Sequence, residues 1–175
     1  MRGSELLDYA AHLYFEAFPK NERMSLTELL SAANDSNVAF VVCRDGSMPV
    51  GFSYCIELSE WLYVLYIATD PRLRSKGYGT RILARIKEKA CGKIVVLGIE
   101  PPDELADNSA QRNARMKFYE RNSFVYSGFD CLDDGMRYLF MATAASLDAA
   151  SLMSEIASVS GGLLEECLCE GKHES

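Results

Sequence analysis

The chain has 175 residues, of which 49% are hydrophobic and 25% are charged, so it is long enough for one domain with a full core and its composition is not that of a disordered chain. Its formal net charge of −7 argues against a general nucleic-acid binder, because such a protein needs a basic face that neutralises phosphates. The chain has no apolar run of about 18 residues and no uninterrupted secretory segment at its N-terminus, so we expect a cytoplasmic protein without a membrane partner.

The first part of the chain predicts two helices followed by three strands. Residues 4–18 carry apolar side chains at helical spacing, and Pro19 ends that helix. Ser25 and Glu28 form a capping box that starts a second helix, which runs to about Ala33. Three strand-like segments follow, with short connections that predict an antiparallel meander, at residues 38–43, 51–57 and 62–68.

The second part predicts a helix at 80–91 and then a buried strand at 93–99. This strand should lie parallel to 62–68, because a helix connects the two. Asn108 with Gln111 is expected to cap a further helix that ends at Arg121, and two strands, 124–129 and 136–142, complete the sheet as a hairpin. The order ααβββαβαββ predicts an α/β domain whose mixed, mostly antiparallel twisted sheet of six to seven strands is flanked by helices.

Residues 144–175 predict a C-terminal helical extension beyond a domain formed by residues 1–143. Two helical stripes separated by Gly161 and Gly162 can be distinguished, namely Ala149, Leu152, Met153 and Ile156, then Leu163, Leu164, Cys167 and Leu168. We expect this extension to pack on the domain or on a partner, in a monomer or a homodimer.

The six cysteines show no paired zinc-binding spacing, and their positions are those of reduced core cysteines. Cys167 and Cys169 with His173 lack a fourth ligand. We therefore expect a protein without a metal.

The stretch from Arg74 to Gly79 follows a predicted strand and precedes a helix. A helix start offers unpaired backbone N–H groups and the positive end of the helix dipole, so it is suited to bind an anion. Gly77 and Gly79 remove the side chains that would obstruct a phosphate, and Arg72, Arg74 and Lys76 add positive charge. We interpret this segment as a binding loop for a diphosphate group.

Three kinds of phosphate loop compete for this segment. A Walker loop needs a Gly-Lys-Ser/Thr ending, which the chain lacks, and a dinucleotide fingerprint needs a third glycine where Ile82 stands. The remaining pattern, Arg-x-x-Gly-x-Gly within TDPRLRSKGYGTRIL, resembles the acetyl-CoA pyrophosphate loop of the GNAT acetyltransferase superfamily. Residues 118–124, FYERNSF, resemble the later motif of that family, with Ser123 where glycine is usual. The resemblance covers roughly residues 5–143.

The resemblance implies a cofactor-binding set for acetyl-CoA. In the family the two parallel strands splay apart and the pantetheine arm lies against the first of them, so backbone groups of Ile67 and Thr69 are expected to hold that arm. The side chain of Arg74 and five backbone amides should hold the diphosphate; these amides belong to Lys76, Gly77, Tyr78, Gly79 and Thr80.

The resemblance also implies direct transfer of an acetyl group from acetyl-CoA to a primary amine of a small molecule or peptide. Tyr119 occupies the usual position of the general acid, which protonates the departing thiolate; alternatively, its ring only packs on the pantetheine arm. Glu100, at the end of strand 93–99, is either the general base or a carboxylate that pairs with a helix. Ordered water can also relay the amine proton without a protein base.

The acceptor side carries less information. The loop between the first two helices borders the acceptor site in the family, which makes Glu22 a candidate, and Tyr54 and Glu57 on the second strand are expected to line the pocket. Family members often have asparagine seven residues before the tyrosine. Here Arg112 stands at that position, so either Arg112 or Asn113 is expected to contact the cofactor.

Two other functions remain open at this stage. One is a catalytically silent CoA-binding module with a regulatory or interaction role, which would keep the loop without the chemistry. The other is an enzyme that binds the phosphates of ATP or NAD instead of CoA.

Overall fold

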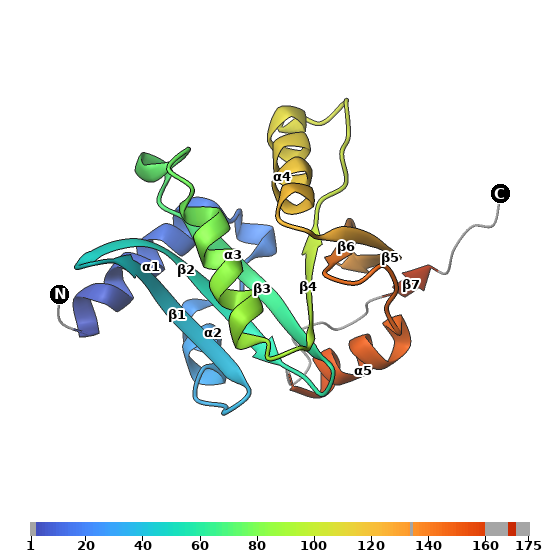
Figure 1. Ribbon diagram of the computed structural model, residues 1–175, viewed down its shortest axis with the longest axis horizontal. Helices are drawn as coiled ribbons and strands as arrows, with labels where there is room; N and C mark the ends of the chain where they lie inside the picture. Colours follow the sequence, from blue (N-terminus) through green and yellow to red (C-terminus); the bar gives the residue numbers. More distant parts are fainter. Residues whose placement is uncertain (1–2, 134, 160–167, 171–175) are drawn as a thin grey trace. The chain divides into compact units, whose positions relative to one another are not determined.

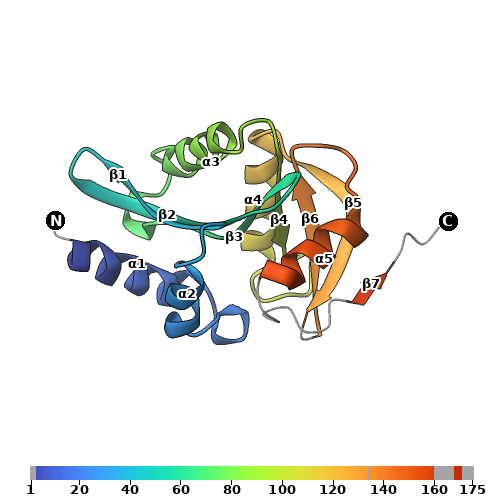
Figure 2. The same ribbon diagram turned by 90° about the horizontal axis from the view of Figure 1, so that it is seen from below.

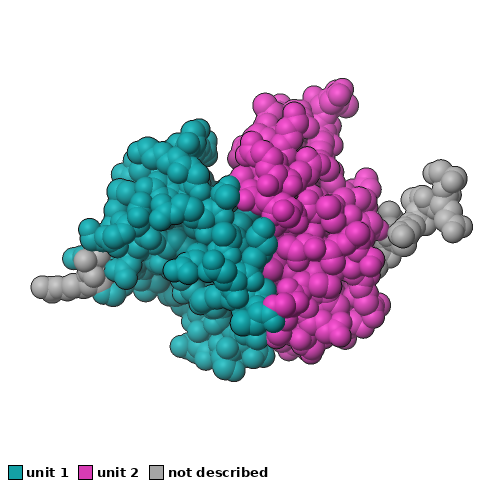
Figure 3. Space-filling view, in the orientation of Figure 1, with its two compact units in different colours: residues 1–57, 64–91 teal, residues 58–63, 92–175 magenta. Residues whose placement is uncertain are grey.

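The computed structural model describes residues 3–133, 135–159 and 168–170, the last of these as backbone only. The chain forms two compact units, shown in different colours in Figure 3. Unit 1 comprises residues 1–57 and 64–91, and unit 2 comprises residues 58–63 and 92–175. The boundary expected at residue 143 stays a prediction.

The described elements follow the predicted order (Figure 1). The helices are α1 (Gly3–Ala17), α2 (Leu26–Ala32), α3 (Tyr78–Lys89), α4 (Ser109–Arg121) and α5 (Ala149–Val159), with short 3-10 turns η1 (Lys20–Glu22) and η2 (Pro71–Leu73). The strands are β1 (Val38–Asp45), β2 (Met48–Glu57), β3 (Trp61–Thr69), β4 (Ile94–Ile99), β5 (Val125–Asp133), β6 (Met136–Ala142) and β7 (Leu168–Glu170). The expected order ααβββαβαββ is therefore confirmed.

Unit 1 contains β1, β2 and the second part of β3 between two helical layers. Strands β1 and β2 pair antiparallel from Val38 opposite Ile56 to Asp45 opposite Met48, and β3 lies next to β2. Helices α1 and α2 cover one face of these strands and α3 covers the other (Figure 2). The predicted capping box at the start of α2 is confirmed, because Ser25 and Glu28 exchange backbone-to-side-chain hydrogen bonds of 2.9 and 3.2 Å.

Tyrosines fix the connection between α1 and α2 to the core of unit 1. The Tyr66 hydroxyl donates to the carbonyl oxygen of Glu22 at 3.0 Å and accepts from the Met24 amide at 3.3 Å. The Tyr14 hydroxyl donates to the Met24 carbonyl oxygen at 3.1 Å, and the rings of Tyr14 and Tyr66 meet edge to face. These hydrogen bonds satisfy the hydroxyls of two buried rings, so the aromatic core also determines the path of the loop.

Unit 2 contains the start of β3, then β4, β6, β5 and β7 in this spatial order. The predicted parallel pairing is confirmed, because Trp61 lies opposite Ile94 and Tyr63 opposite Val96. The hairpin of β5 and β6 is also confirmed, although β5 runs to Asp133, beyond the expected end at residue 129. Its register shifts between Tyr126 and Asp130, where Gly128 has φ of 79°, so a bulge lets the strand continue past its apparent end.

The C-terminal extension differs in part from the prediction. Helix α5 is confirmed, and its buried side chains are three of the four expected ones, Leu152, Met153 and Ile156. Leu163, Leu164 and Cys167 lie outside the described residues. The expectation that Leu168 continues a helical stripe is wrong, because Leu168–Glu170 forms β7 and pairs antiparallel with β5. Three residues beside an existing strand gain backbone hydrogen bonds that their apolar spacing does not reveal.

The expectation that all cysteines are reduced is wrong for one of them. Cys43, Cys55 and Cys91 are free, whereas Cys131 in β5 is disulfide-bonded. Disulfide formation depends on the separation of two backbone positions in the fold, which spacing along the chain does not give. Of the possible metal ligands Cys167, Cys169 and His173, the first and the last lie outside the described residues.

Two properties bear on possible partners. Within residues 3–133, 135–159 and 168–170, no helix combines the length and the apolar character that a membrane span requires. In the same part of the chain, no group of three or more His, Cys, Asp or Glu side chains is arranged to hold a metal ion.

Gly51 on β2 is a close-approach position. A Cβ atom at this residue would collide with the carbonyl oxygen of Ala68 and lie 2.9 Å from Cδ1 of Ile82. We predict that Gly51→Ala lowers the free energy of unfolding by about 2 kcal/mol, because the strand and the helix would have to move apart. Urea denaturation measures this change. Gly98→Ala is the control, since its Cβ would lie 3.6 Å from Tyr138, and an equal loss in both variants would contradict the prediction.

Ser123 holds the strained position that ends α4. Its φ of 63° is in the left-handed region, and it follows the helix C-cap Asn122. We predict that Ser123→Gly raises the free energy of unfolding by about 1 kcal/mol, because glycine adopts this conformation without a Cβ clash. Thermal and urea denaturation test this change. Ser123→Ala keeps the Cβ atom and should not stabilise the protein; equal stabilisation by alanine would assign the effect to the hydroxyl.

Candidate functional site

The segment that connects β3 to α3 in unit 1 begins with a buried carboxylate. Asp70 is only 4% exposed, and it accepts hydrogen bonds from the Arg72 amide at 2.9 Å and from the Arg72 guanidinium at 2.9 and 2.6 Å. The Arg72 hydrogen bonds hold the pKa of this carboxyl below its usual value. The Asp70 amide in turn donates to the Val50 carbonyl oxygen at 3.0 Å. The start of the predicted diphosphate loop is therefore tied to β2.

The start of α3 has the geometry that an anion site requires. Gly77 is the N-cap residue with φ of 77°, and the Arg81 amide donates to its carbonyl oxygen at 3.1 Å. The amides of Tyr78, Gly79 and Thr80 precede that first helical hydrogen bond, so helix geometry leaves them without intrahelical acceptors. A Cβ at Gly77 would have open space around it, so here glycine is needed for its φ and the surface above it stays accessible.

A second carboxylate fixes the side chains at this helix start. Asp45 at the end of β1 accepts from the Tyr78 hydroxyl at 3.0 Å and from Arg81 at 3.2 Å. The hydrogen bond from Arg81, followed by that from Tyr78, holds the pKa of the Asp45 carboxyl below its usual value. The Tyr78 side chain is thus directed at Asp45, which leaves its backbone amide as the group available to a ligand.

Five further residues that are predicted to hold acetyl-CoA also lie in unit 1. Ile67 and Thr69 are half-buried at the end of β3, and the side chains of Arg74, Lys76 and Thr80 are exposed around the start of α3. Two cations and a set of backbone amides therefore lie within one short segment of chain.

The three predicted acceptor-side residues differ in exposure. Glu22 is half-buried in the connection between α1 and α2, and Glu57 is exposed at the end of β2. Tyr54, in contrast, is 1% exposed, and its hydroxyl donates to the carbonyl oxygen of Leu29 at 3.2 Å. The structure gives Tyr54 a core position, where its ring packs against Phe40.

Helix α4 in unit 2 turns an unexpected face inward. Ala110, Ala114 and Phe118 repeat at the spacing of an apolar helix face, but both alanines are exposed. The buried face instead contains Arg112 and Arg115, whose side chains are 14% and 31% exposed, and Tyr119, which is 7% exposed. These three residues are spaced by three and four positions and lie on one face of the helix.

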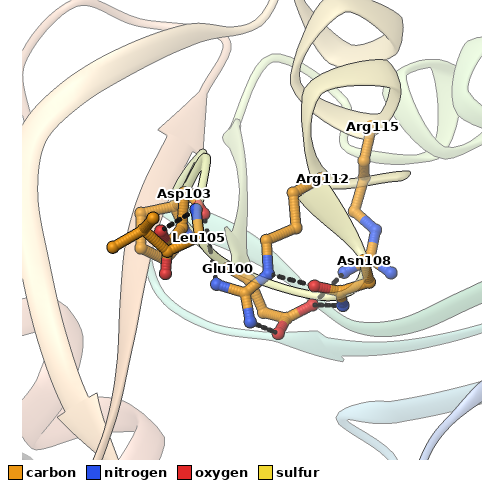
Figure 4. A network of polar contacts seen from close by, with 7 residues as sticks. Glu100, Asp103, Leu105, Asn108, Arg112 and Arg115 are labelled. Carbon is orange, nitrogen blue, oxygen red and sulfur yellow. Dashed lines mark hydrogen bonds and ion pairs between the residues drawn. The ribbon is translucent and has the colours of Figure 1, made fainter. Parts of the chain in front are cut away.

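Glu100 explains how two arginines can occupy that face. Glu100 immediately follows the last residue of β4, and its side chain is 6% exposed. One carboxylate oxygen forms an ion pair with Arg112 at 2.6 Å, and the other forms an ion pair with Arg115 at 3.3 Å (Figure 4). The Asn108 side chain approaches the second oxygen at 3.5 Å. The sequence left two roles open for Glu100, a general base or a carboxylate that pairs with a helix. The contacts of Glu100 are those of a carboxylate that pairs with a helix.

Arg112 has all three guanidinium nitrogens engaged within unit 2. Besides Glu100, it donates to the Asn108 side chain at 2.7 Å and to the Pro101 carbonyl oxygen at 3.4 Å. Asn108 is the N-cap residue of α4, as expected, but its side chain makes no capping hydrogen bond and is engaged in this network instead. Asn113 is exposed, and its side chain donates to the Ser109 carbonyl oxygen of its own helix at 3.1 Å.

Tyr119 is the buried member of this face. Burial raises the pKa of Tyr119 to about 12, while the positive charge of Arg115, one turn earlier, acts in the opposite direction. The phenol therefore stays protonated at neutral pH and can donate a proton. Its ring packs edge to face against Phe118 and Phe124.

Sequence reasoning missed three residues that position these groups, namely Asp45, Asp70 and Arg115, and it gave Asn108 the role of a helix cap alone. A local signal existed for Asp70, because aspartate before proline is typical of a turn start. Asp45 and Arg115 had no such signal, since their partners are distant in the chain.

Comparisons with known proteins agree on one family. A family model described as Acetyltransferase (GNAT) domain matches residues 35–126, which is 92 of the 175 residues. A curated Bacillus subtilis protein assigned as an acetyltransferase, YjbC, is 28% identical over 71 residues, which make up 41% of this chain and 34% of that protein. The chain thus spans about a third of the length of this relative.

Solved structures share the fold. A Bacteroides thetaiotaomicron protein assigned to the GNAT family has a TM-score of 0.69 and 25% identity, covering 93% of this chain and 94% of that chain. An aminoglycoside 6'-N-acetyltransferase complexed with coenzyme A has a TM-score of 0.63 and 17% identity, covering 78% and 88%. These similarities confirm the predicted fold class.

The burial of Tyr119 predicts a specific alkaline sensitivity. Its pKa is about 12 in the folded protein against about 10 in the unfolded chain. The stability from the buried neutral phenol is therefore present below about pH 10 and is lost as the pH rises towards 12. We predict that the stability difference between the protein and Tyr119→Phe shifts by about 2 kcal/mol, in favour of the variant, between pH 8 and pH 12. Urea denaturation over this range measures it; a constant difference would show an accessible hydroxyl.

Proposed function

Because this chain belongs to the GNAT acetyltransferase family, we propose that it transfers an acetyl group from acetyl-CoA to a primary amine of a small molecule or peptide. The observation that carries the proposal is the start of α3. Backbone amides that precede the first helical hydrogen bond, a left-handed glycine and exposed cations lie together there, and they would form a cradle for a diphosphate group.

The donor would be held mainly by backbone groups of unit 1. The amides of residues 76–80 would bind the diphosphate, and the Arg74 side chain would add a charged contact. Backbone groups of Ile67 and Thr69 would hold the pantetheine arm, as in the family that the chain resembles. Asp70 and Asp45 support this role indirectly, since they fix the two ends of the loop.

Tyr119 in unit 2 would act as the general acid. Acetyl-CoA supplies an activated thioester; when the bond from carbonyl carbon to sulfur breaks, the thiolate takes the phenolic proton. A positioned phenol that gives its proton to a thiolate of reference pKa about 8.5 would accelerate this step by general acid catalysis. The raised pKa of Tyr119 keeps its hydroxyl at neutral pH in the protonated form that a proton donor needs.

The amine proton is the remaining requirement, because only the neutral amine attacks the carbonyl carbon. We propose that water removes this proton, since both oxygens of Glu100 already receive arginines. Glu22 and Glu57 are candidates for contact with a cationic acceptor, because both are carboxylates with solvent-accessible surface.

Ligand binding and turnover test the proposal together. We predict that acetyl-CoA raises the melting temperature while ATP and NAD do not, because binding to the folded state stabilises it by mass action. Arg74→Ala combined with Lys76→Ala should weaken acetyl-CoA binding by roughly tenfold or more, since each lost charge-assisted hydrogen bond is worth about 1.5 kcal/mol. Arg121→Ala, an exposed cation of α4, is the control and should bind as the unmodified protein does.

Tyr119→Phe separates an enzyme from a silent CoA-binding module. With a panel of amines and detection of free thiol, the variant should lose about a hundredfold in kcat and keep its affinity for acetyl-CoA. Binding of ATP or NAD in place of acetyl-CoA would overturn the donor assignment. Acetyl-CoA binding without turnover of any amine in the panel would favour the silent module.

A further inference from the structure

Glu100 joins the end of a strand to two successive turns of a helix. It immediately follows β4, and two prolines, Pro101 and Pro102, follow it, so its backbone has little freedom. Its side chain reaches Arg112 and Arg115, which lie on the buried face of α4 (Figure 4). Tyr119 lies on the same face, one turn beyond Arg115.

Both oxygens of Glu100 are engaged, which argues against a role as proton acceptor. A general base needs an oxygen within about 2.6–3.2 Å of the proton that it removes, directly or through one water. Here one oxygen receives Arg112 at 2.6 Å and the other receives Arg115 and Asn108. Arg112 and Arg115 are both half-buried, and Glu100 supplies the counter-charge for their two guanidinium groups.

We propose that Glu100 is a positioning residue: by bridging Arg112 and Arg115 it fixes α4, and with it the Tyr119 hydroxyl, relative to the end of β4. This inference rests on the proposed function, in which Tyr119 is the acid. It gives Glu100 a role other than that of a general base, and it gives Arg112 a role other than contact with the cofactor.

The charges in this cluster give the bridge a second effect. Two guanidinium groups face one carboxylate, and Arg115 is the more exposed of the two. Glu100 holds Arg115 towards β4, so the distance of this cation from the Tyr119 hydroxyl is fixed as well. Loss of the carboxylate would free Arg115 and change the charge that the phenol senses, even if α4 stayed folded.

The experiment compares Glu100→Gln, Glu100→Asp and the control Glu104→Gln, an exposed carboxylate in the following loop. We expect Glu100→Gln to lower kcat by roughly tenfold to a hundredfold, since small displacements of a catalytic group have effects of this size. The KM for acetyl-CoA should change less than about twofold, and the acidic limb of the pH profile of kcat/KM should stay in place. Glu100→Asp should recover part of the activity, and Glu104→Gln should match the unmodified protein.

Arg115→Gln tests the coupling. Because Arg115 and Glu100 act through one ion pair, the double variant Glu100→Gln with Arg115→Gln should lose no more kcat than the more damaging single variant. Loss of the acidic limb in Glu100→Gln would overturn the proposal in favour of a general base. Full activity of Glu100→Gln, or multiplied losses in the double variant, would also overturn it.

A measurement without turnover keeps this inference separate from the proposed function. NMR of the protein labelled with ¹³C-tyrosine, with Tyr119 assigned through Tyr119→Phe, follows the titration of this phenol directly. We expect Glu100→Gln to move its midpoint by about half a pH unit or more, and Glu104→Gln to leave it unchanged. An unmoved midpoint overturns the positioning role even if acetyl transfer is demonstrated. A moved midpoint supports the coupling of Glu100 to this phenol, even if no amine in the panel is acetylated.

Discussion

A buried carboxylate stays ionised only where other groups replace the water that it has lost, and this constraint acts at the ends of both parallel strands. Asp70 follows β3 and Glu100 follows β4; they are 4% and 5% exposed, and a proline comes next in each case. Arginines supply the replacement, Arg72 for Asp70 and two residues of α4 for Glu100. Each strand therefore ends in an acid–proline pair that directs the chain and attracts an arginine from the segment that follows.

The two acids act on different kinds of functional group. In unit 1, Asp70 binds the backbone and side chain of Arg72, and what it organises is a loop whose useful groups are backbone amides. Side-chain identity matters little for such amides, except where Gly77 needs a positive φ. In unit 2, Glu100 acts on the face of a long helix, and what it organises is one side chain, Tyr119. Binding by the proposed loop should therefore tolerate many substitutions, whereas proton transfer by the proposed acid should tolerate few.

The sequence predicted the features that have local causes. The capping box of α2 needs only Ser25 and Glu28 at a fixed spacing, and the helix between β3 and β4 makes those strands parallel. Prediction from the sequence failed where a residue distant in the chain determines which side chains are buried or which strands pair. The spacing of Ala110 and Ala114 favours their face of α4 as the buried one, because arginines rarely turn inward; Glu100, which is distant in the chain from Arg112 and Arg115, pairs with both on the opposite face. The same holds for β7, whose three residues form a strand because β5 lies beside them.

The arginine at position 112 and the carboxylate at position 100 therefore have a single physical explanation. Considered alone, Arg112 stands where the family often has a cofactor-binding asparagine, and Glu100 stands where some members have a catalytic carboxylate. The two side chains form an ion pair at 2.6 Å. This pair engages the guanidinium group that Arg112 would need to bind the cofactor and the carboxylate that Glu100 would need to act as a base. An arginine that neutralises Glu100 keeps that carboxylate from serving as a base, and a carboxylate that holds Arg112 keeps that guanidinium from a phosphate. The arginine at position 112 thus acts on Glu100, so the two residues have to be considered as a pair.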